Sequence, residues 1–112
     1  MSVVRPDLLD DEDSFTPQAR QALTEIFTRF DKDGDGVFSQ AEVDAFAIAS
    51  NGSKFDSSTL EEIKEYFDVD SNGQLTLQGF LEMFQMQTLA DTEETWKDLE
   101  KHGYDDQLHL KT

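Results

Sequence analysis

The sequence predicts an all-α domain in which two helix-loop-helix units pack together and a fifth helix follows them. Two acidic, glycine-containing loops of the same pattern begin 37 residues apart, at Asp31 and Asp68, and form an internal repeat. Apolar residues recur at helical spacing on both sides of each loop, and a further amphipathic pattern surrounds Trp96. One such unit cannot bury its own apolar face, so we expect the two units to share one core.

The first loop, residues 31–42, carries oxygen atoms at the spacing that a hard divalent cation requires. Its ligand positions 1, 3, 5, 7, 9 and 12 are Asp31, Asp33, Asp35, Val37, Ser39 and Glu42. Val37 offers its backbone carbonyl, Ser39 ligates directly or through a water, and Glu42 closes the site with both carboxylate oxygens. Gly36 stands at position 6, where the chain bends sharply. A merely solvated acidic loop explains the aspartates but not Gly36 and Glu42 in register, so the pattern predicts a Ca²⁺ site.

The second loop, residues 68–79, repeats this pattern incompletely. Its ligand positions 1, 3, 5, 7 and 9 are Asp68, Asp70, Asn72, Gln74 and Thr76. Position 12 is Gly79, so the bidentate carboxylate and one negative charge are missing, and affinity depends on the charge of the ligands. Two outcomes stay open: a weak site completed by Glu82 and a water, or an empty loop that serves as a structural partner. In either case we expect one tight calcium equivalent.

Capping residues predict where several helices begin. Thr16 and Pro17 fit the N-cap and the first residue of the first helix. Ser58, with Glu61 three residues later, predicts a capping box at the start of the third helix. Asp91, followed by acidic residues in the first turn, predicts the start of the fifth helix.

The two loops are expected to meet in a short antiparallel ribbon, with Phe38 and Leu75 face to face, because both stand at loop position 8. The inner helix faces are predicted to carry Ala19, Ala22, Leu23, Ile26, Phe27 and Phe30; then Val43, Phe46 and Ala47; then Leu60, Ile63, Tyr66 and Phe67; and finally Phe80, Leu81 and Phe84. Met83 and Met86 fit either the core or an adaptable partner-binding groove.

The pattern divides the chain into three parts. Residues 1–15 read as a disordered acidic arm, 16–90 as the pair of units, and 91–112 as the C-terminal helix with a short extended tail. Alternation at Leu108-His109-Leu110 predicts a short strand in that tail. We expect Trp96 to pack over the fourth helix, and His102 and His109 to lie on the surface.

The charge balance narrows the class of partner. The 112 residues, a length typical of one domain, include 25 acidic and 9 basic side chains, for a net charge of −16. Such an excess argues against binding to nucleic acid or anionic membranes, and favours cations or a basic protein segment. There is no cysteine, no apolar run long enough to span a membrane, and no nucleophile–base motif of an enzyme. We therefore expect a non-enzymatic monomer in the cytoplasm.

The run from Asp31 to Glu42 resembles the calcium loop of EF-hand proteins, and the resemblance extends over residues 17–90 as an EF-hand pair. A narrower likeness, to the first EF-hand region of the mitochondrial Rho GTPases (Miro), is carried by Leu75-Thr76-Leu77-Gln78-Gly79-Phe80-Leu81, Glu94-Thr95-Trp96 and Gly103-Tyr104-Asp105-Asp106-Gln107-Leu108-His109-Leu110. This likeness implies that the first hand pairs with a hidden, non-binding hand, and that a segment mimicking a ligand helix follows a tryptophan-bearing helix.

Two features depart from the Miro pattern. The chain contains neither the phosphate loop nor the switch regions of a GTPase, so a role in mitochondrial trafficking does not carry over. Its second loop also keeps Asp68, Asp70, Asn72 and Gly73, which the hidden hand lacks. The likeness favours an empty second loop, and these retained residues keep a weak site open.

The loops and the apolar helix faces are compatible with two functions of the domain. In the first, calcium at residues 31–42 moves the second helix and changes an apolar groove that binds a protein or peptide partner. In the second, the domain is a static structural module in which calcium only stabilises the fold. A third function, calcium buffering, is less favoured, because a chain of 112 residues with one complete loop would bind little calcium for its size.

Overall fold

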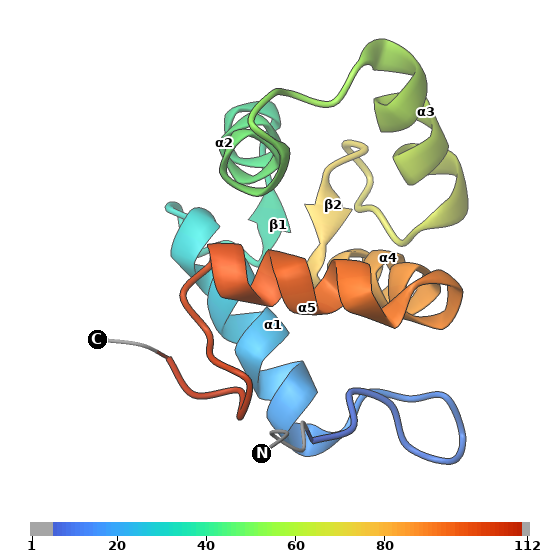
Figure 1. Ribbon diagram of the computed structural model, residues 1–112. Coiled ribbons are helices and arrows are strands. Elements are labelled where there is room, and N and C mark those ends of the chain that lie inside the picture. Colours follow the sequence, from blue (N-terminus) through green and yellow to red (C-terminus); the bar gives the residue numbers. More distant parts are fainter. Residues whose placement is uncertain (1–5, 111–112) are drawn as a thin grey trace.

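The computed structural model describes residues 6–110. Within that range the chain forms helices α1 (Pro17–Phe30), α2 (Gln40–Asn51), α3 (Ser57–Tyr66), α4 (Leu77–Ala90) and α5 (Thr92–Lys101), and strands β1 (Val37–Phe38) and β2 (Leu75–Thr76) (Figure 1). The strands pair antiparallel between the two loops, and α5 packs against α4 and also contacts α2. The predicted all-α class, with a joining ribbon and a fifth helix, is confirmed.

The ribbon lies at the centre of an aromatic core. Phe38 pairs with Leu75 in the predicted register, and Phe38 is almost fully buried. The Phe38 ring stacks on Phe27 of α1, with centroids 4.2 Å apart, and meets Phe80 of α4 edge-on at 5.7 Å. Such aromatic pairs contribute about 0.5–1.5 kcal/mol beyond the area they bury. The ribbon therefore joins the two units through side chains from both of them.

Helix α3 begins one residue earlier than predicted and with a different cap. Asp56 is the N-cap, and its Oδ1 accepts a hydrogen bond of 2.8 Å from the Thr59 backbone N–H. This bond lowers the pKa of the Asp56 carboxyl, because the ionised form is the better acceptor. The capping box predicted at Ser58 and Glu61 is wrong, because the Asp56 carboxylate satisfies the first turn before Ser58 is reached.

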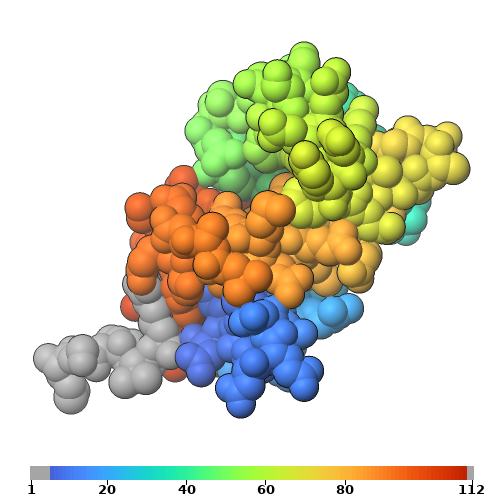
Figure 2. Space-filling model, turned by 90° about the vertical axis from the view of Figure 1, so that its right-hand side faces the viewer, coloured from blue at the N-terminus to red at the C-terminus, as the bar shows by residue number. Residues whose placement is uncertain are grey.

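Helix α3 is also the least buried of the five helices in residues 6–110. Ile63 is the one residue of α3 that is buried, whereas Tyr66, predicted on the inner face, is 67% exposed. Figure 2 shows α3 and its flanking segments as a projecting lobe beside α2 and above the α4–α5 layer. The apolar residues of α3 thus have helical spacing, but Tyr66 at the end of the helix faces solvent instead of the core.

Residues 6–15 differ from the disordered arm that their composition predicts; residues 1–5 lie outside the described part of the chain. Leu8 is buried in the core, and Leu9 pairs with Phe15 in an isolated antiparallel bridge. The Thr16 N–H donates to the Leu8 carbonyl at 2.9 Å, and Gln85 of α4 donates to a backbone carbonyl of the same segment. One buried leucine and these backbone bonds hold the segment in spite of its acidic sequence.

The C-terminal tail forms a turn rather than the predicted short strand. Tyr104 and Leu110 make one isolated bridge, and Leu108 has a positive φ of 60°. Tyr104 is buried and donates a 2.6 Å hydrogen bond to Glu25 of α1. Burial and this bond to the carboxylate raise the pKa of Tyr104 to about 12. The tail is thus fixed against α1.

His102 is buried, in contrast to the surface position expected for it. Its ring stacks on Phe46 of α2, with centroids 5.4 Å apart and planes 5° from parallel. Burial, together with the positive charges of Arg29 and Lys101, lowers the pKa of His102 to about 4 from an ordinary value of 6.5. The imidazole is therefore neutral at pH 7 in the folded protein.

This shift predicts how stability depends on pH. Between pH 6.5 and about 4 the unfolded chain binds more protons at His102 than the folded protein. The stabilisation due to neutral His102 is complete above pH 6.5 and is lost as the pH falls through about 4. We expect His102→Gln to make the free energy of unfolding less dependent on pH in this window, as measured by urea unfolding. The exposed His109→Gln should keep the wild-type slope, and equal slopes for both variants would contradict the assignment.

Candidate metal centre

The first loop brings three carboxylates together between α1 and α2. Oxygen atoms of Asp31, Asp35 and Glu42 lie within 4.8 Å of one another, the one such group of acids among residues 6–110. Ligand oxygens around Ca²⁺ lie 2.3–2.6 Å from the ion, so two of them can be separated by up to about 5 Å. The spacing of the three carboxylates therefore suits one shared cation.

Asp31 carries the most direct sign of a missing partner. Its Oδ2 accepts a 2.8 Å hydrogen bond from the Gly36 backbone N–H. Its Oδ1 is buried without a hydrogen-bond partner, and in the described residues no other buried side-chain oxygen or nitrogen lacks one. A buried, unsatisfied charged oxygen is costly, and a bound cation would satisfy it. The donor set thus fits Ca²⁺ in chemistry as well as in spacing.

Glu42 is held toward the loop by the start of its own helix. Ser39 and Glu42 form a capping box, in which the Ser39 N–H donates to Glu42 Oε1 at 2.8 Å. The other oxygen, Oε2, accepts a 2.8 Å bond from the Lys32 backbone N–H at the beginning of the loop. Oε2 also accepts a longer bond of 3.4 Å from the Asp33 N–H, whereas Oε1 keeps a second lone pair, so Glu42 remains able to bind a metal.

The other predicted ligands of the first loop are arranged less closely. Asp33 is exposed and lies outside the carboxylate group. Ser39 Oγ accepts the Glu42 N–H as a helix cap, and Val37 lies in β1, where it pairs with Thr76. The structure therefore gathers the acids at positions 1, 5 and 12, while the role of Asp33 stays a prediction.

The second loop is closed by hydrogen bonds of its own. Asp70 donates its backbone N–H to the Gln74 carbonyl, and Asp70 Oδ1 accepts the Asn72 and Gln74 N–H groups, each at 2.9 Å. The Thr76 hydroxyl bonds the Asp68 carboxylate directly. Side chains predicted as ligands at positions 1, 3 and 9 thus bind one another or the backbone.

The same closed turn occurs at two places outside the loops. Asp10 and Asp105 each donate N–H to the carbonyl four residues on, at 2.8 Å for Ser14 and 2.9 Å for His109. In both turns Oδ1 accepts the N–H groups two and four residues later, as it does for Asp70. Since the turn forms in segments without any metal-binding pattern, its formation at Asp70 requires no cation.

Position 12 of the second loop has no room for a side chain. A Cβ atom on Gly79 would lie 2.2 Å from the Asp68 carbonyl oxygen. Glu82, considered as a replacement ligand, instead accepts the Asp68 backbone N–H through Oε1 at 2.9 Å. The close packing of α4 on the loop, which Gly79 permits, therefore leaves no space for an acid at position 12.

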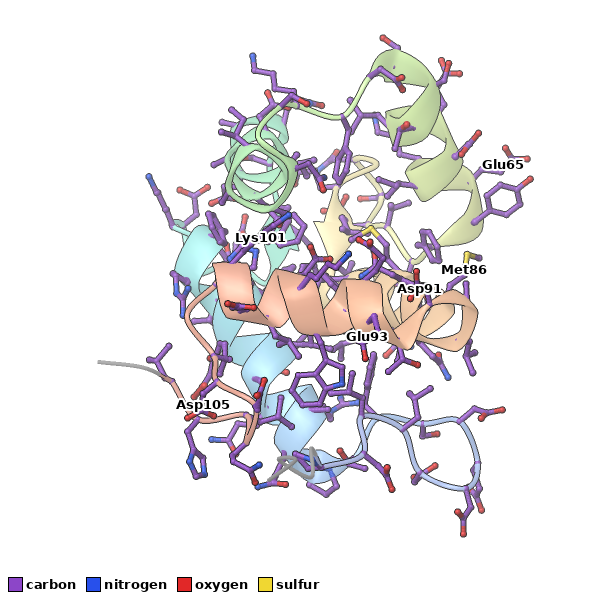
Figure 3. All side chains as sticks on the ribbon, viewed as in Figure 1. Glu65, Met86, Asp91, Glu93, Lys101 and Asp105 are labelled. Carbon is purple, nitrogen blue, oxygen red and sulfur yellow. The ribbon has the colours of Figure 1, made fainter. Side chains whose placement is uncertain are left out.

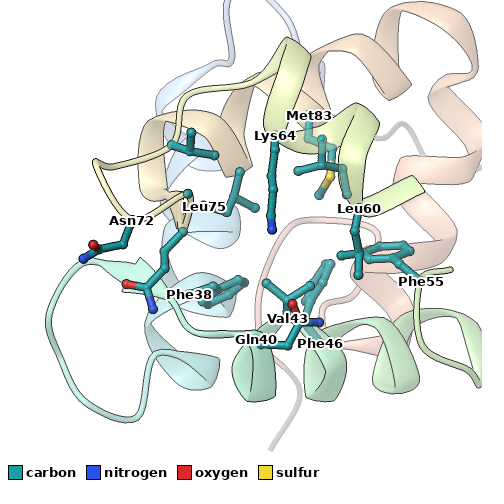
Figure 4. Close-up of a pocket in the computed structure, with 14 residues that line it drawn as sticks. Phe38, Gln40, Val43, Phe46, Phe55, Leu60, Lys64, Asn72, Leu75 and Met83 are labelled. Atoms are coloured by element: carbon teal, nitrogen blue, oxygen red, sulfur yellow. The ribbon is translucent and has the colours of Figure 1, made fainter. Parts of the chain in front are cut away.

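An apolar groove lies between α2, α3 and α4. It consists of two adjoining hollows of about 250 and 490 Å³ that share Phe46, Phe55, Ile63 and Met83. Figure 4 shows Phe38 and Val43 on one side of the smaller hollow and Leu60 on the other. Met86 lines the larger hollow and extends from α4 toward the end of α3 (Figure 3).

Two residues with buried polar groups, Asp98 and His102, were not predicted from the sequence. Asp98 lines the larger hollow and accepts a 2.9 Å bond from Gln87, and burial raises the pKa of its carboxyl. Both residues share one helical face with the buried Thr95 and Leu99, because positions 95, 98, 99 and 102 follow helical spacing. That spacing is the signal that could have identified both residues.

The family follows from comparison of the whole sequence with known proteins. A model of the EF-hand domain pair matches residues 20–85, more than half of the chain and both loops. The chain belongs to the EF-hand family. EF-hand domains bind Ca²⁺, so the predicted ion is supported by the family as well as by the acids of the first loop.

The relatives are much longer EF-hand proteins. EF-hand calcium-binding domain-containing protein 7 of Xenopus laevis is 35% identical over 98 residues, which cover 85% of this chain and 16% of the relative. The mouse protein of the same name is 34% identical over 100 residues, covering 87% and 16%. Mitochondrial Rho GTPase 1 of Cryptococcus neoformans is 36% identical over 89 residues, covering 80% and 12%. The predicted resemblance to the Miro family is confirmed, and the EF-hand chain spans at most 16% of the length of these relatives.

The close approach at Gly79 yields a stability prediction for this EF-hand pair. Gly→Ala inside a helix ordinarily stabilises, but Gly79→Ala should lower the free energy of unfolding by about 1–3 kcal/mol, because the new Cβ overlaps the Asp68 carbonyl. Chemical denaturation measures this, with the neighbouring, exposed Gln78→Ala as the control. A Gly79→Ala variant as stable as wild type would show that the loop and α4 are not packed as described.

Proposed function

We propose that this EF-hand pair is a calcium-regulated protein-interaction module with one high-affinity site, at residues 31–42, and an inert second loop. The observation that carries the proposal is the buried, unpartnered Oδ1 of Asp31 beside the carboxylates of Asp35 and Glu42. The ligands we assign are Asp31, Asp33, Asp35, Val37, Ser39 and Glu42. The second loop differs in two ways: among the described residues it holds no buried, unpartnered side-chain oxygen, and its position 12, Gly79, has no room for a carboxylate.

Helix α2 connects this site to the groove. Glu42 lies in its first turn, and Phe46, one turn later, lines both hollows. A cation that draws Glu42 toward Asp31 fixes the position of α2 and so sets the width of the groove between α2 and α3. Because α3 has little other packing, it can adjust to an occupant at small cost.

The groove suits a partner with an apolar face and basic flanks. Its walls are mainly aromatic and aliphatic; Glu62 and Asp98 add negative groups to the larger hollow, and Lys64 adds a positive group to the smaller one. With a net charge of −16, the domain attracts a basic segment and repels an acidic one. An amphipathic helix with lysine or arginine beside its apolar residues meets both conditions.

We propose that this module is monomeric and lies in the cytoplasm. The net negative charge and the lack of cysteine favour this assignment. In residues 6–110 no helix combines the length and the apolar character needed to cross a membrane. In the longer relatives the matching region is a small part of the chain, so activities of those whole proteins are not assigned to this domain.

A calcium titration tests the assignment of the site. With millimolar magnesium as background, calorimetry should give one calcium equivalent for the wild type. Glu42→Gln should weaken binding by at least about tenfold, because it removes the bidentate charge but keeps a residue suited to the capping box. Glu82→Gln is the matched control and should bind as the wild type does. Two tight equivalents, or equal losses in both variants, would contradict a single site at residues 31–42.

A second measurement separates regulation from simple stabilisation. A regulated groove predicts a calcium-dependent change in the fluorescence of an apolar dye, abolished by Glu42→Gln. A static module predicts the same dye signal with and without calcium, and a raised melting temperature alone. Stabilisation would then amount to about 2.7 kcal/mol at a hundredfold excess of calcium over the dissociation constant.

A further inference from the structure

The C-terminal end of α5 contacts both helices that flank the calcium loop. Figure 3 shows Lys101 at this end of α5, facing α2. Its Nζ donates a 2.7 Å hydrogen bond to the Ser50 carbonyl in the last turn of α2. A cation at the C-terminal end of a helix also interacts favourably with the helix dipole. Lys101 thus binds the end of α2 farthest from the calcium loop.

His102 extends this contact to the side chains of α2. Its Nε2 lies 2.8 Å from Ser50 Oγ, and both side chains are buried. Its ring stacks on Phe46, one turn before Ser50. Glu42, Phe46 and Ser50 are spaced by four residues, so they lie along one face of α2. The face that His102 holds is therefore the one that carries Glu42 to the loop.

The same residue is attached to α1, the helix that leads into the loop. Arg29 donates a 2.8 Å hydrogen bond to the His102 carbonyl oxygen. Phe30, the last residue of α1, meets the His102 ring edge-on at 5.6 Å. Asp31 follows Phe30 directly. The end of α5 thus fixes α1 and α2 relative to each other, close to where the calcium ligands begin.

We propose that Lys101 and His102, here called the α5 clamp, are positioning residues for calcium: they hold α2 at the angle to α1 that brings Glu42 to the site. This inference rests on the proposed calcium site at residues 31–42. Its basis is that the clamp contacts and the gathered carboxylates occur together in one structure. If α2 were free to pivot, a smaller fraction of molecules would be ready to bind, and apparent affinity would fall by that fraction.

Such coupling acts in both directions. Because linkage is reciprocal, calcium must stabilise the clamp by the same factor by which the clamp strengthens calcium binding. Binding should therefore slow hydrogen exchange of the His102 N–H, which donates to the Asp98 and Leu99 carbonyls at 3.1 Å. Calcium slows exchange through global unfolding at every residue, so the comparison requires that the His102 N–H exchange faster than the slowest core amides, through local opening. In that regime a residue with a purely structural role would not show calcium dependence.

Calorimetric titration of clamp variants with calcium tests the proposal. Lys101→Ala combined with Ser50→Ala should weaken binding by at least about fivefold, the lower range of measured couplings. Lys97→Ala removes the same charge from an exposed position of α5, where it pairs with Glu94, and should leave affinity unchanged. Lys101→Arg, which keeps a cationic donor, should retain most of the affinity. Circular dichroism establishes that each variant is folded, and Lys101→Ala alone replaces the double variant if that one unfolds.

The outcomes separate the clamp from the site itself. A wild-type domain that binds calcium, with clamp variants of equal or tighter affinity, overturns the clamp and leaves the site standing. A wild-type domain that binds no calcium overturns both. Weaker binding by the clamp variants, together with His102 exchange that calcium slows in the wild type but not in Glu42→Gln, supports the clamp.

Discussion

The contact between Phe38 and Leu75 across the ribbon is the constraint around which the domain is arranged. Phe38 has 1% of its surface exposed and packs between aromatic rings of α1, α2 and α4. Burying one such ring stabilises the fold by about 1.5–3 kcal/mol. Because this burial needs a strand from each loop, the second loop keeps its shape although its acids bond within the loop. The second hand is thus required for the first hand to fold, whatever its own affinity for metal.

Features that depend on near neighbours could be predicted from the sequence. The ribbon register, the start of α1 at Pro17 and the acids of the first loop follow from spacing over a few residues. Ser39 and Glu42 likewise cap α2 and orient a ligand through one local motif. Local chemistry determines these features, so the sequence alone could indicate them.

Features that depend on distant partners could not be predicted in this way. His102 looks like a surface residue until Phe46 and Ser50, more than fifty positions away, surround it. Leu8 lies in an acidic segment, and its burial depends on a core formed by the later helices. The sequence did not decide between a weak and an empty second loop, because the approach of Asp68 to Gly79 depends on the packing of α4.

The three Asp-anchored turns have a consequence for how this acidic chain responds to its surroundings. In each turn one oxygen of the carboxylate accepts two backbone N–H groups of the turn itself, so the chain supplies its partners. The first loop instead holds a buried oxygen that backbone groups do not reach. With the single calcium site proposed above, the response to the ionic environment is expected to be concentrated in the first loop, while the three Asp-anchored turns keep their shape.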